Sequence, residues 1–267
     1  MKFFIFVLNL VIKCNDDRVI ERAAGLTYRI LLAFFPFLVF LMSLIGFLEF
    51  DKEGLFEGLY KVLPGDVSEL VAGFVMELGE TRSGGLMSTA LFFSLYNTNN
   101  GFRAAVRCIN ISLETEERRG ILRQIGLGLV LTMLFSIAII VMLGLVAFGR
   151  QIWLVFFPGG NEIMFTVASG ASAMIVLIFT TMMIYKLASA RRLGFLQVLP
   201  GAGFTVLGWV VASALFGFIT QNFTQYPAVY GSIAGVFILM LWLNTVAVLL
   251  LIGNEINASL VEIRQKK

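Results

Sequence analysis

The sequence predicts an all-α polytopic membrane protein with six transmembrane helices. Six apolar stretches recur along the chain, and each is near the ~20 residues that a helix needs to cross ~30 Å of hydrocarbon. Only 14% of the 267 residues are charged, whereas a soluble domain averages about 25%. The basic residues gather in every second gap between the apolar stretches. The predicted spans cover residues 26–48, 86–109, 121–148, 163–185, 195–220 and 229–252.

The uneven distribution of the basic residues predicts the orientation of the chain. Sixteen of the 20 Lys and Arg residues lie in one set of gaps, and the other set holds only Lys52, Lys61, Arg82 and Arg150. Because basic residues near span ends stay in the cytoplasm, we expect both termini to be cytoplasmic. The net charge of +3 suits the anionic lipid head groups on that face. No basic stripe with interleaved aromatic residues indicates a nucleic-acid partner.

The segments outside the spans predict further helices at the membrane surface. Residues 1–25 form a cytoplasmic segment whose apolar start predicts a short helix lying in the inner interface. The extracytoplasmic loop 49–84 is acidic, and its apolar residues recur at helical spacing on both sides of Pro64. We therefore expect two short amphipathic helices there. Residues 26–263 form one membrane domain, and Pro36 is expected to kink its first span.

The composition argues against an enzyme. Histidine is absent from the chain, which excludes Ser-His-Asp and Cys-His catalysis and His-ligated zinc. Cys14 and Cys108 both lie on the predicted cytoplasmic side, and we expect two reduced thiols rather than a metal site or a disulfide. No catalytic group of residues is evident, so we expect no enzymatic activity, no metal and no other cofactor.

The second predicted span carries polar residues at its centre. Residues 97–100 read Asn-Thr-Asn-Asn, and four consecutive residues cover about 300° of a helix. No single stripe shielded from lipid can hide them all. Arg103 and Arg107 continue the face of Asn100 at helical spacing. Either Asn97, Asn100 and Arg103 face a polar cavity, or the span sits higher and both arginines reach the inner head groups, the interpretation we favour for Arg107.

Other polar residues, at the inner ends of spans or, for Asn244, within the sixth span, are candidates for the walls of the same cavity. They are Tyr28, Arg29, Asn244 and Glu255. Two interpretations of Glu255 stay open: it pairs with Arg29 or Arg103, or it lies at a solvated helix end.

Several short strings resemble the YihY/BrkB family of bacterial inner-membrane proteins. They are RAAGLTY at 22–28, AFFP at 33–36, Asn110, PGA at 200–202, YGS at 230–232 and GNEINA at 253–258. Asn254 stands where the family usually has Ala. The resemblance implies a six-span protein of the bacterial cytoplasmic (inner) membrane. The family has carried a ribonuclease label, but metal-assisted RNA cleavage needs clustered His and carboxylate ligands, which this sequence does not offer.

Two functions from different classes fit these observations. The first is a transporter or permease-like protein whose polar cavity opens toward the cytoplasm and takes an anionic or amphipathic solute or lipid. The second is a non-transporting membrane scaffold of envelope assembly or integrity, with loop 49–84 as its docking segment. The discriminating observation is whether Asn97, Asn100 and Arg103 surround a water-accessible space or lie buried against neighbouring helices.

Overall fold

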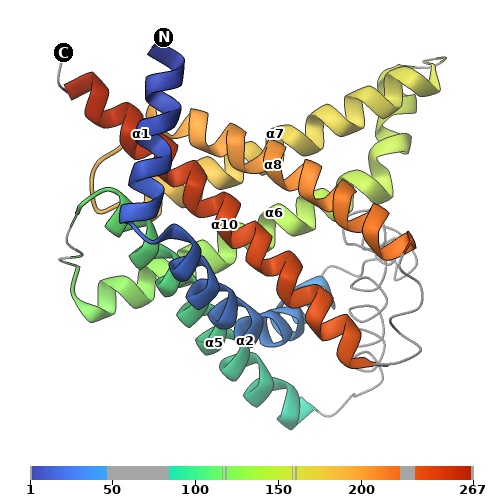
Figure 1. The fold of residues 1–267 in the computed structure, drawn as a ribbon. Helices are drawn as coiled ribbons and strands as arrows, with labels where there is room; N and C mark the ends of the chain where they lie inside the picture. The colour runs from blue at the N-terminus through green and yellow to red at the C-terminus, as the bar shows by residue number, and fades with distance from the viewer. Residues whose placement is uncertain are drawn as a thin grey trace.

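A computed structural model describes residues 2–46, 84–115, 117, 119–157, 159, 161–222 and 232–265. Within these residues the regular structure is entirely α-helical, which confirms the predicted fold class (Figure 1). The helices are α1 (Lys2–Asp16), α2 (Val19–Gly46), α5 (Gly84–Ser112), α6 (Ile121–Phe156), α7 (Glu162–Ala188), α8 (Phe195–Asn222) and α10 (Ser232–Gln265).

Five of the described helices are long and apolar enough to cross a membrane. Their qualifying segments are Val19–Leu41, Ile121–Val146, Glu162–Ala188, Phe195–Ile219 and Gly235–Gln265. By length and composition, these segments are candidate membrane spans. The helix α5 covers the second predicted span but is too polar to qualify by composition. A sixth crossing therefore depends on the position of α5 among the other helices.

The helices α2, α5, α6, α7, α8 and α10 form a closed ring. Each packs against the next in this order, and α10 returns to pack against α2. In addition, α5 contacts α7 and α10 across the ring. The polar helix α5 thus lies between apolar neighbours, which supplies partners that hydrocarbon cannot offer. Figure 1 shows α10 running beside α2 and α8, with the two chain ends close together.

Successive helices alternate in direction, so the ring has two ends of different chemistry. The starts of α2, α6 and α8 meet the ends of α5, α7 and α10, and we call this the basic end. It carries the described basic residues Lys13, Arg18, Arg22, Arg29, Arg103, Arg107, Arg119, Arg123, Lys186, Arg191, Arg192 and Arg264. At the opposite end, which we call the far end, Arg150 is the one basic residue in the described part of the chain.

Local sequence explains where several helices begin and end. Arg18 adopts a left-handed φ of 48°, and this residue separates α1 from α2. Glu114, with φ 50°, follows the end of α5. At the start of α7, the Asn161 side chain accepts a hydrogen bond from the Ile163 N–H at 3.2 Å, as expected of an N-cap.

The helices extend beyond several predicted boundaries. The last span was predicted to end at residue 252, but α10 continues to Gln265, and neighbouring helices bury its polar side chains Asn254, Glu255 and Asn257. The helix α6 likewise extends to Phe156. Helical structure is continuous through Pro36, so a bend there stays a prediction. The predicted outer helices of loop 49–84 lie outside the described residues, apart from Gly84.

The core changes character between the two ends. Near the far end, a cluster from α2, α6 and α10 is wholly apolar. It comprises Phe37, Leu38, Phe40, Leu41, Leu143, Leu239, Trp242 and Leu243. Toward the basic end, fully buried polar side chains enter the core, among them Thr27, Asn254, Glu255 and Asn257. Two further apolar clusters lie toward the basic end, so these polar side chains are packed among apolar ones.

Candidate functional site

The polar run of α5 is divided between packing and partial exposure. Thr98 and Asn99 are buried. The Asn99 side-chain amide donates to the Ile125 carbonyl of α6 at 2.8 Å, and Asn99 lies against Gly128. Asn97 and Asn100 are half-buried, and the Asn97 amide bonds to the Phe93 carbonyl of its own helix at 2.9 Å. The helix α6 therefore satisfies Asn99, while Asn97 and Asn100 stay partly open.

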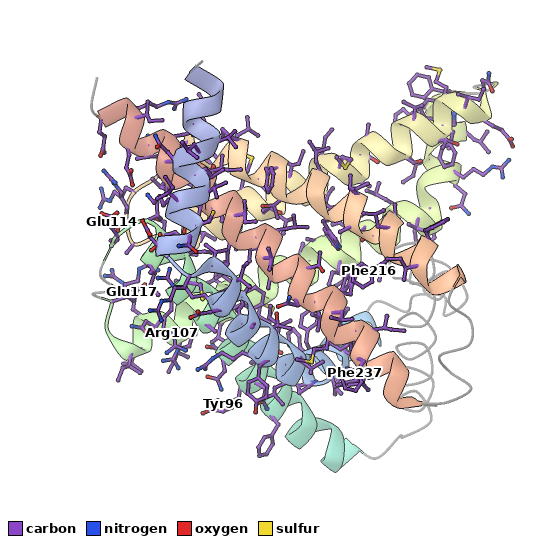
Figure 2. The ribbon with its side chains drawn as sticks, viewed as in Figure 1. Tyr96, Arg107, Glu114, Glu117, Phe216 and Phe237 are labelled. Atoms are coloured by element: carbon purple, nitrogen blue, oxygen red, sulfur yellow. The ribbon has the colours of Figure 1, made fainter. Side chains whose placement is uncertain are left out.

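One edge of α5 combines aromatic and basic side chains. Tyr96 and Arg107 are exposed, and Arg103 is half-buried between them. Figure 2 shows Tyr96 and Arg107 on the outer side of the bundle. The spacing of Tyr96, Asn100, Arg103 and Arg107 places all four on one stripe of the helix.

The helix α2 supplies a second row beside this stripe. A Cβ at Gly101 of α5 would lie 3.2 Å from the Ala33 Cβ and 3.8 Å from the Arg29 carbonyl oxygen, so the two backbones approach closely here. Tyr28 and Arg29 are both exposed. We call the surface formed by Tyr28, Arg29, Asn100, Arg103 and Arg107 the α2/α5 basic strip.

The arginines of the α2/α5 basic strip carry charge that no carboxylate in the described part of the chain neutralises. None of Arg29, Arg103 and Arg107 forms an ion pair there. Arg29 and Arg107, together with Arg22, also lie close enough to Cys108 to act on its thiol electrostatically. The strip is therefore suited to an anion, such as a phosphate or a carboxylate.

Asn244 does not belong to the α2/α5 basic strip. It is half-buried in α10, and its side-chain oxygen lies 3.1 Å from the Thr27 hydroxyl oxygen. Thr27 is fully buried, whereas its neighbour Tyr28 is 58% exposed. The structure thus brings Asn244 to Thr27 and leaves Tyr28 on the outside.

Glu255 lies in an environment that neither sequence interpretation anticipated. Its side chain is 0% exposed, so it is not a solvated helix end. Both carboxylate oxygens lack hydrogen-bond partners, so neither Arg29 nor Arg103 pairs with it. The reason is that α1 packs against α10 and brings other charged groups, Lys13 and Asp17, to face the Glu255 carboxyl.

Lys13 is also the residue that ties the two chain ends together. It forms an ion pair with Glu262 of α10. The adjacent Cys14 is a free thiol. Its pKa is raised to about 11, mainly because the thiol is partly buried and secondly because the carboxyls of Glu255 and Asp17 lie nearby. This thiol is therefore poorly reactive at neutral pH.

A tight crossing of α8 and α10 lies beside Glu255. A Cβ at Gly253 would come within 2.6 Å of both the Gly201 carbonyl oxygen and the Tyr185 hydroxyl oxygen. The buried Tyr185 hydroxyl donates to the Leu250 carbonyl at 2.7 Å and lies 2.7 Å from the Thr205 hydroxyl. Asn257 accepts a hydrogen bond from the Gly201 N–H at 2.8 Å. Glycine is therefore required on both helices.

Asn110 and Arg119 join α5 to the end of α7. The Asn110 amide donates to the Glu117 carboxylate at 2.8 Å and to the Ala188 carbonyl at 3.1 Å. Arg119 donates to the carbonyls of residues 187–189, where a helix C-terminus favours positive charge. Sequence reasoning found Asn110 only through the family resemblance, and it missed Arg119, Tyr185 and the glycine crossing.

The described residues contain no group of three or more His, Cys, Asp or Glu side chains placed to hold a metal ion. A shallow crevice lies at the far end instead, between α6 and α7. Arg150, Trp153, Glu162 and Phe165 are among its walls. The exposed ion pair of Arg150 and Glu162, at 3.3 Å, crosses it.

Comparison with known proteins places these features in a family. Residues 10–267 match the family described as virulence factor BrkB. The chain is 32% identical to the ribonuclease-like protein YfkH of Bacillus subtilis over 248 residues, which cover 90% of this chain and 89% of that protein.

More distant relatives are described only as membrane proteins. A UPF0761 membrane protein of Alteromonas mediterranea is 23% identical over 96% of this chain and 87% of its own length. Another, from Pseudoalteromonas atlantica, is 25% identical over 94% of this chain and 84% of its own length. No solved structure matches the chain. The predicted resemblance is confirmed: this chain belongs to the virulence factor BrkB family of membrane proteins.

Proposed function

We propose that this chain is a permease-like transporter of the bacterial inner membrane that moves an anionic or amphipathic solute or lipid. In this proposal α5 is the sixth crossing, both termini are cytoplasmic, and the basic end faces the cytoplasm. The observation that carries the proposal is the α2/α5 basic strip, whose arginines have no carboxylate partner among the described residues.

Two further features support an opening toward the basic end. Apolar clusters occur along the whole core, but the buried polar side chains Thr27, Asn254 and Glu255 lie toward the basic end, where water is less disfavoured. Toward the basic end, Asn97, Asn100 and Arg103 are only half-buried. We propose that these three residues, with Tyr28 and Arg29 nearby, line the route of the solute, whereas Asn244 and Glu255 belong to separate polar contacts. An anionic lipid head group matches both the guanidinium groups and the aromatic ring of Tyr28.

The ribonuclease-like name of the Bacillus relative does not lead us to propose nuclease activity here. The sequence has no histidine, and its described carboxylates form no group suited to a metal ion. Residues that could bind and activate metal ions for RNA cleavage are therefore not assembled in the described ring.

The transport proposal is tested in proteoliposomes with fluorescent phosphatidylglycerol, whose movement between leaflets is followed by chemical quenching. We expect wild-type protein to move the lipid. Arg103→Ala and Asn100→Leu are expected to slow it, and Arg103→Ala by roughly tenfold or more, because a hydrogen bond to a charged group contributes about 1.5–3 kcal/mol. Arg123→Ala, an exposed arginine in the first turn of α6, is the matched control and should retain the wild-type rate.

The outcomes separate the two candidate functions. Full activity in both variants would remove the α2/α5 basic strip as the transport site. An inactive wild type, with no lipid enriched in the purified protein by mass spectrometry, would favour the scaffold instead. In that case, crosslinking from loop 49–84 should capture an envelope partner.

A further inference from the structure

The buried polar atoms around Glu255 form a site that the transport proposal does not use. Both oxygens of Glu255 and the side-chain oxygen of Asn254 are buried without hydrogen-bond partners. The amide of Asn254 is oriented by its bond to the Ile109 carbonyl at 3.0 Å, so its oxygen is the atom left over. Residues 254 and 255 therefore present three unpaired acceptors, two of them on a single carboxyl group, and the Asn257 amide nitrogen is an unpaired buried donor two residues further along α10.

The charged and polar groups around Glu255 come from several elements. Lys13 from α1, Asp17 from the α1–α2 junction and Ser112 at the end of α5 face its carboxyl. The side chains of Tyr185 and Thr205, from α7 and α8, are occupied with each other and with backbone carbonyls.

Each nearby cation already has an anionic partner. Lys13 is paired with Glu262. Arg22 is paired with Asp17 at 3.4 Å through one terminal nitrogen, and its other terminal nitrogen is buried without a hydrogen-bond partner. The Ser112 hydroxyl lies within hydrogen-bonding distance of the Cys108 carbonyl, at 3.4 Å. As arranged, neither carboxylate oxygen of Glu255 has a hydrogen-bond partner of good geometry, although the Ser112 hydroxyl and the Asp17 carboxyl face it closely enough to form one after a small shift.

An ionised Glu255 would be strongly disfavoured in this arrangement. A buried carboxylate without donors costs several kcal/mol. Ser112 is the last residue of α5, so the negative end of that helix dipole also lies near the carboxyl. The neutral acid avoids both penalties.

We propose that Glu255 is a proton-binding site, occupied by a proton in the arrangement seen here and emptied when Lys13 exchanges Glu262 for Glu255. On release, the carboxyl O–H bond breaks and the proton passes to water. The Lys13 ammonium then neutralises the new Glu255 carboxylate. Glu262 loses its partner but is 42% exposed, so water can hydrate it. The exchange moves α1 relative to α10 and so couples proton binding to the shape of the basic end.

The ligand is a proton and not a metal ion. Hard cations take about six or more oxygen ligands, whereas the described residues offer two carboxylate oxygens and the oxygen of Asn254. The ammonium of Lys13 also faces the site and would repel a metal ion.

Infrared spectroscopy of the purified protein in lipid tests the proposal without any transport assay. The C=O stretch of a protonated carboxyl should be present near neutral pH and should vanish as the pH rises. Glu255→Gln should lose this band while keeping its melting temperature, because the amide matches the neutral acid in shape. Glu262→Gln removes the present partner of Lys13, so Lys13 is free to neutralise Glu255 and the midpoint of the band should move to lower pH.

A second variant leaves Glu255 in place and tests the role of Lys13. Removing the cation that stabilises the ionised form should make proton release harder. Lys13→Met is therefore expected to move the midpoint of the band about one pH unit upward. Three results would overturn the proposal. The band could survive in Glu255→Gln, the wild type could show no titrating band, or the midpoint could stay unshifted in Lys13→Met. A midpoint that depends on sodium concentration would replace the proton with a metal cation and overturn it too.

Discussion

The residues 253–257 of α10 combine helix packing with an unusual polar environment. Gly253 admits the backbone of α8, and Asn257 bonds to it, while Glu255 is left without donors. The sequence identified this string as part of a family motif and placed Glu255 at the inner end of a span. It did not identify the neighbours of Glu255, because the contact between α1 and α10 joins residues 249 positions apart. Such a contact leaves no local pattern in the sequence.

The glycine crossing of α8 and α10 is expected to resist even one added methyl group. In Gly201→Ala the new Cβ would overlap the Gly253 carbonyl oxygen, which is backbone and cannot rotate away. We expect a loss of about 1–3 kcal/mol of unfolding free energy, measured as a lower melting temperature in detergent. Gly203→Ala, in the same helix with nothing within 4 Å of its Cβ, should melt at or above the wild-type temperature. Equal melting of the two variants would contradict the crossing.

The sequence predicted some helices more completely than others. The five apolar helices follow directly from their composition. The helix α5 was predicted as a span in spite of its polar centre, and the structure confirms the helix over Gly84–Ser112. The sequence could not predict which of the polar residues 97–100 are buried and which are partly exposed. Asn99 is buried because it packs against Gly128 of α6, and no local pattern predicts that contact. Among the candidate residues, Asn100 and Arg103 share a stripe, whereas Asn244 and Glu255 belong to separate polar contacts.

The helix α1 presents an apolar face that has no cover in the described structure. Its exposed side chains include Val7, Leu8, Val11 and Ile12, at 39–60% exposure. We expect this face to lie in the inner membrane interface. A bimane label at Val11→Cys, in a background without Cys14 and Cys108, should be quenched by a lipid-borne quencher.

The matched control for α1 is Asn9→Cys, which lies two residues and about 200° away from Val11 on the helix. Its label should respond to iodide in the water and little to the lipid-borne quencher. Equal responses at the two positions would show that α1 does not lie along the interface.

At the scale of the whole molecule, the alternation of basic residues predicts the direction of every described helix. All but one of the described basic residues occur at a single end of the ring. The closure of the ring by α10 against α2 was not predictable, because no local pattern specifies which non-consecutive helices meet. Three α10 residues, Leu239, Trp242 and Leu243, belong to the apolar cluster shared with α2 and α6.

The orientation itself is tested by cysteine labelling in intact cells, again without the two native thiols. Arg264 is exposed at the basic end, whereas Asp66 belongs to loop 49–84, outside the described residues. Because basic residues mark the cytoplasmic side, Asp66→Cys should react with an impermeant maleimide and Arg264→Cys should react only after lysis. The reverse pattern would invert the proposed topology.

Ring closure by α10 also sets an order for biogenesis. During synthesis α2 and α5 leave the ribosome well before α10. The hydrogen bonds of Thr27 with Asn244 and of the Ile109 carbonyl with Asn254 can therefore form only after α10 has been made. In that interval the polar helix α5 has only earlier helices to shield it from lipid, and such incomplete intermediates are prone to misassembly. The carboxyl of Glu255 enters the core with the same late helix. Burial of this acidic group is therefore one of the last events in co-translational assembly, after the rest of the ring has been inserted.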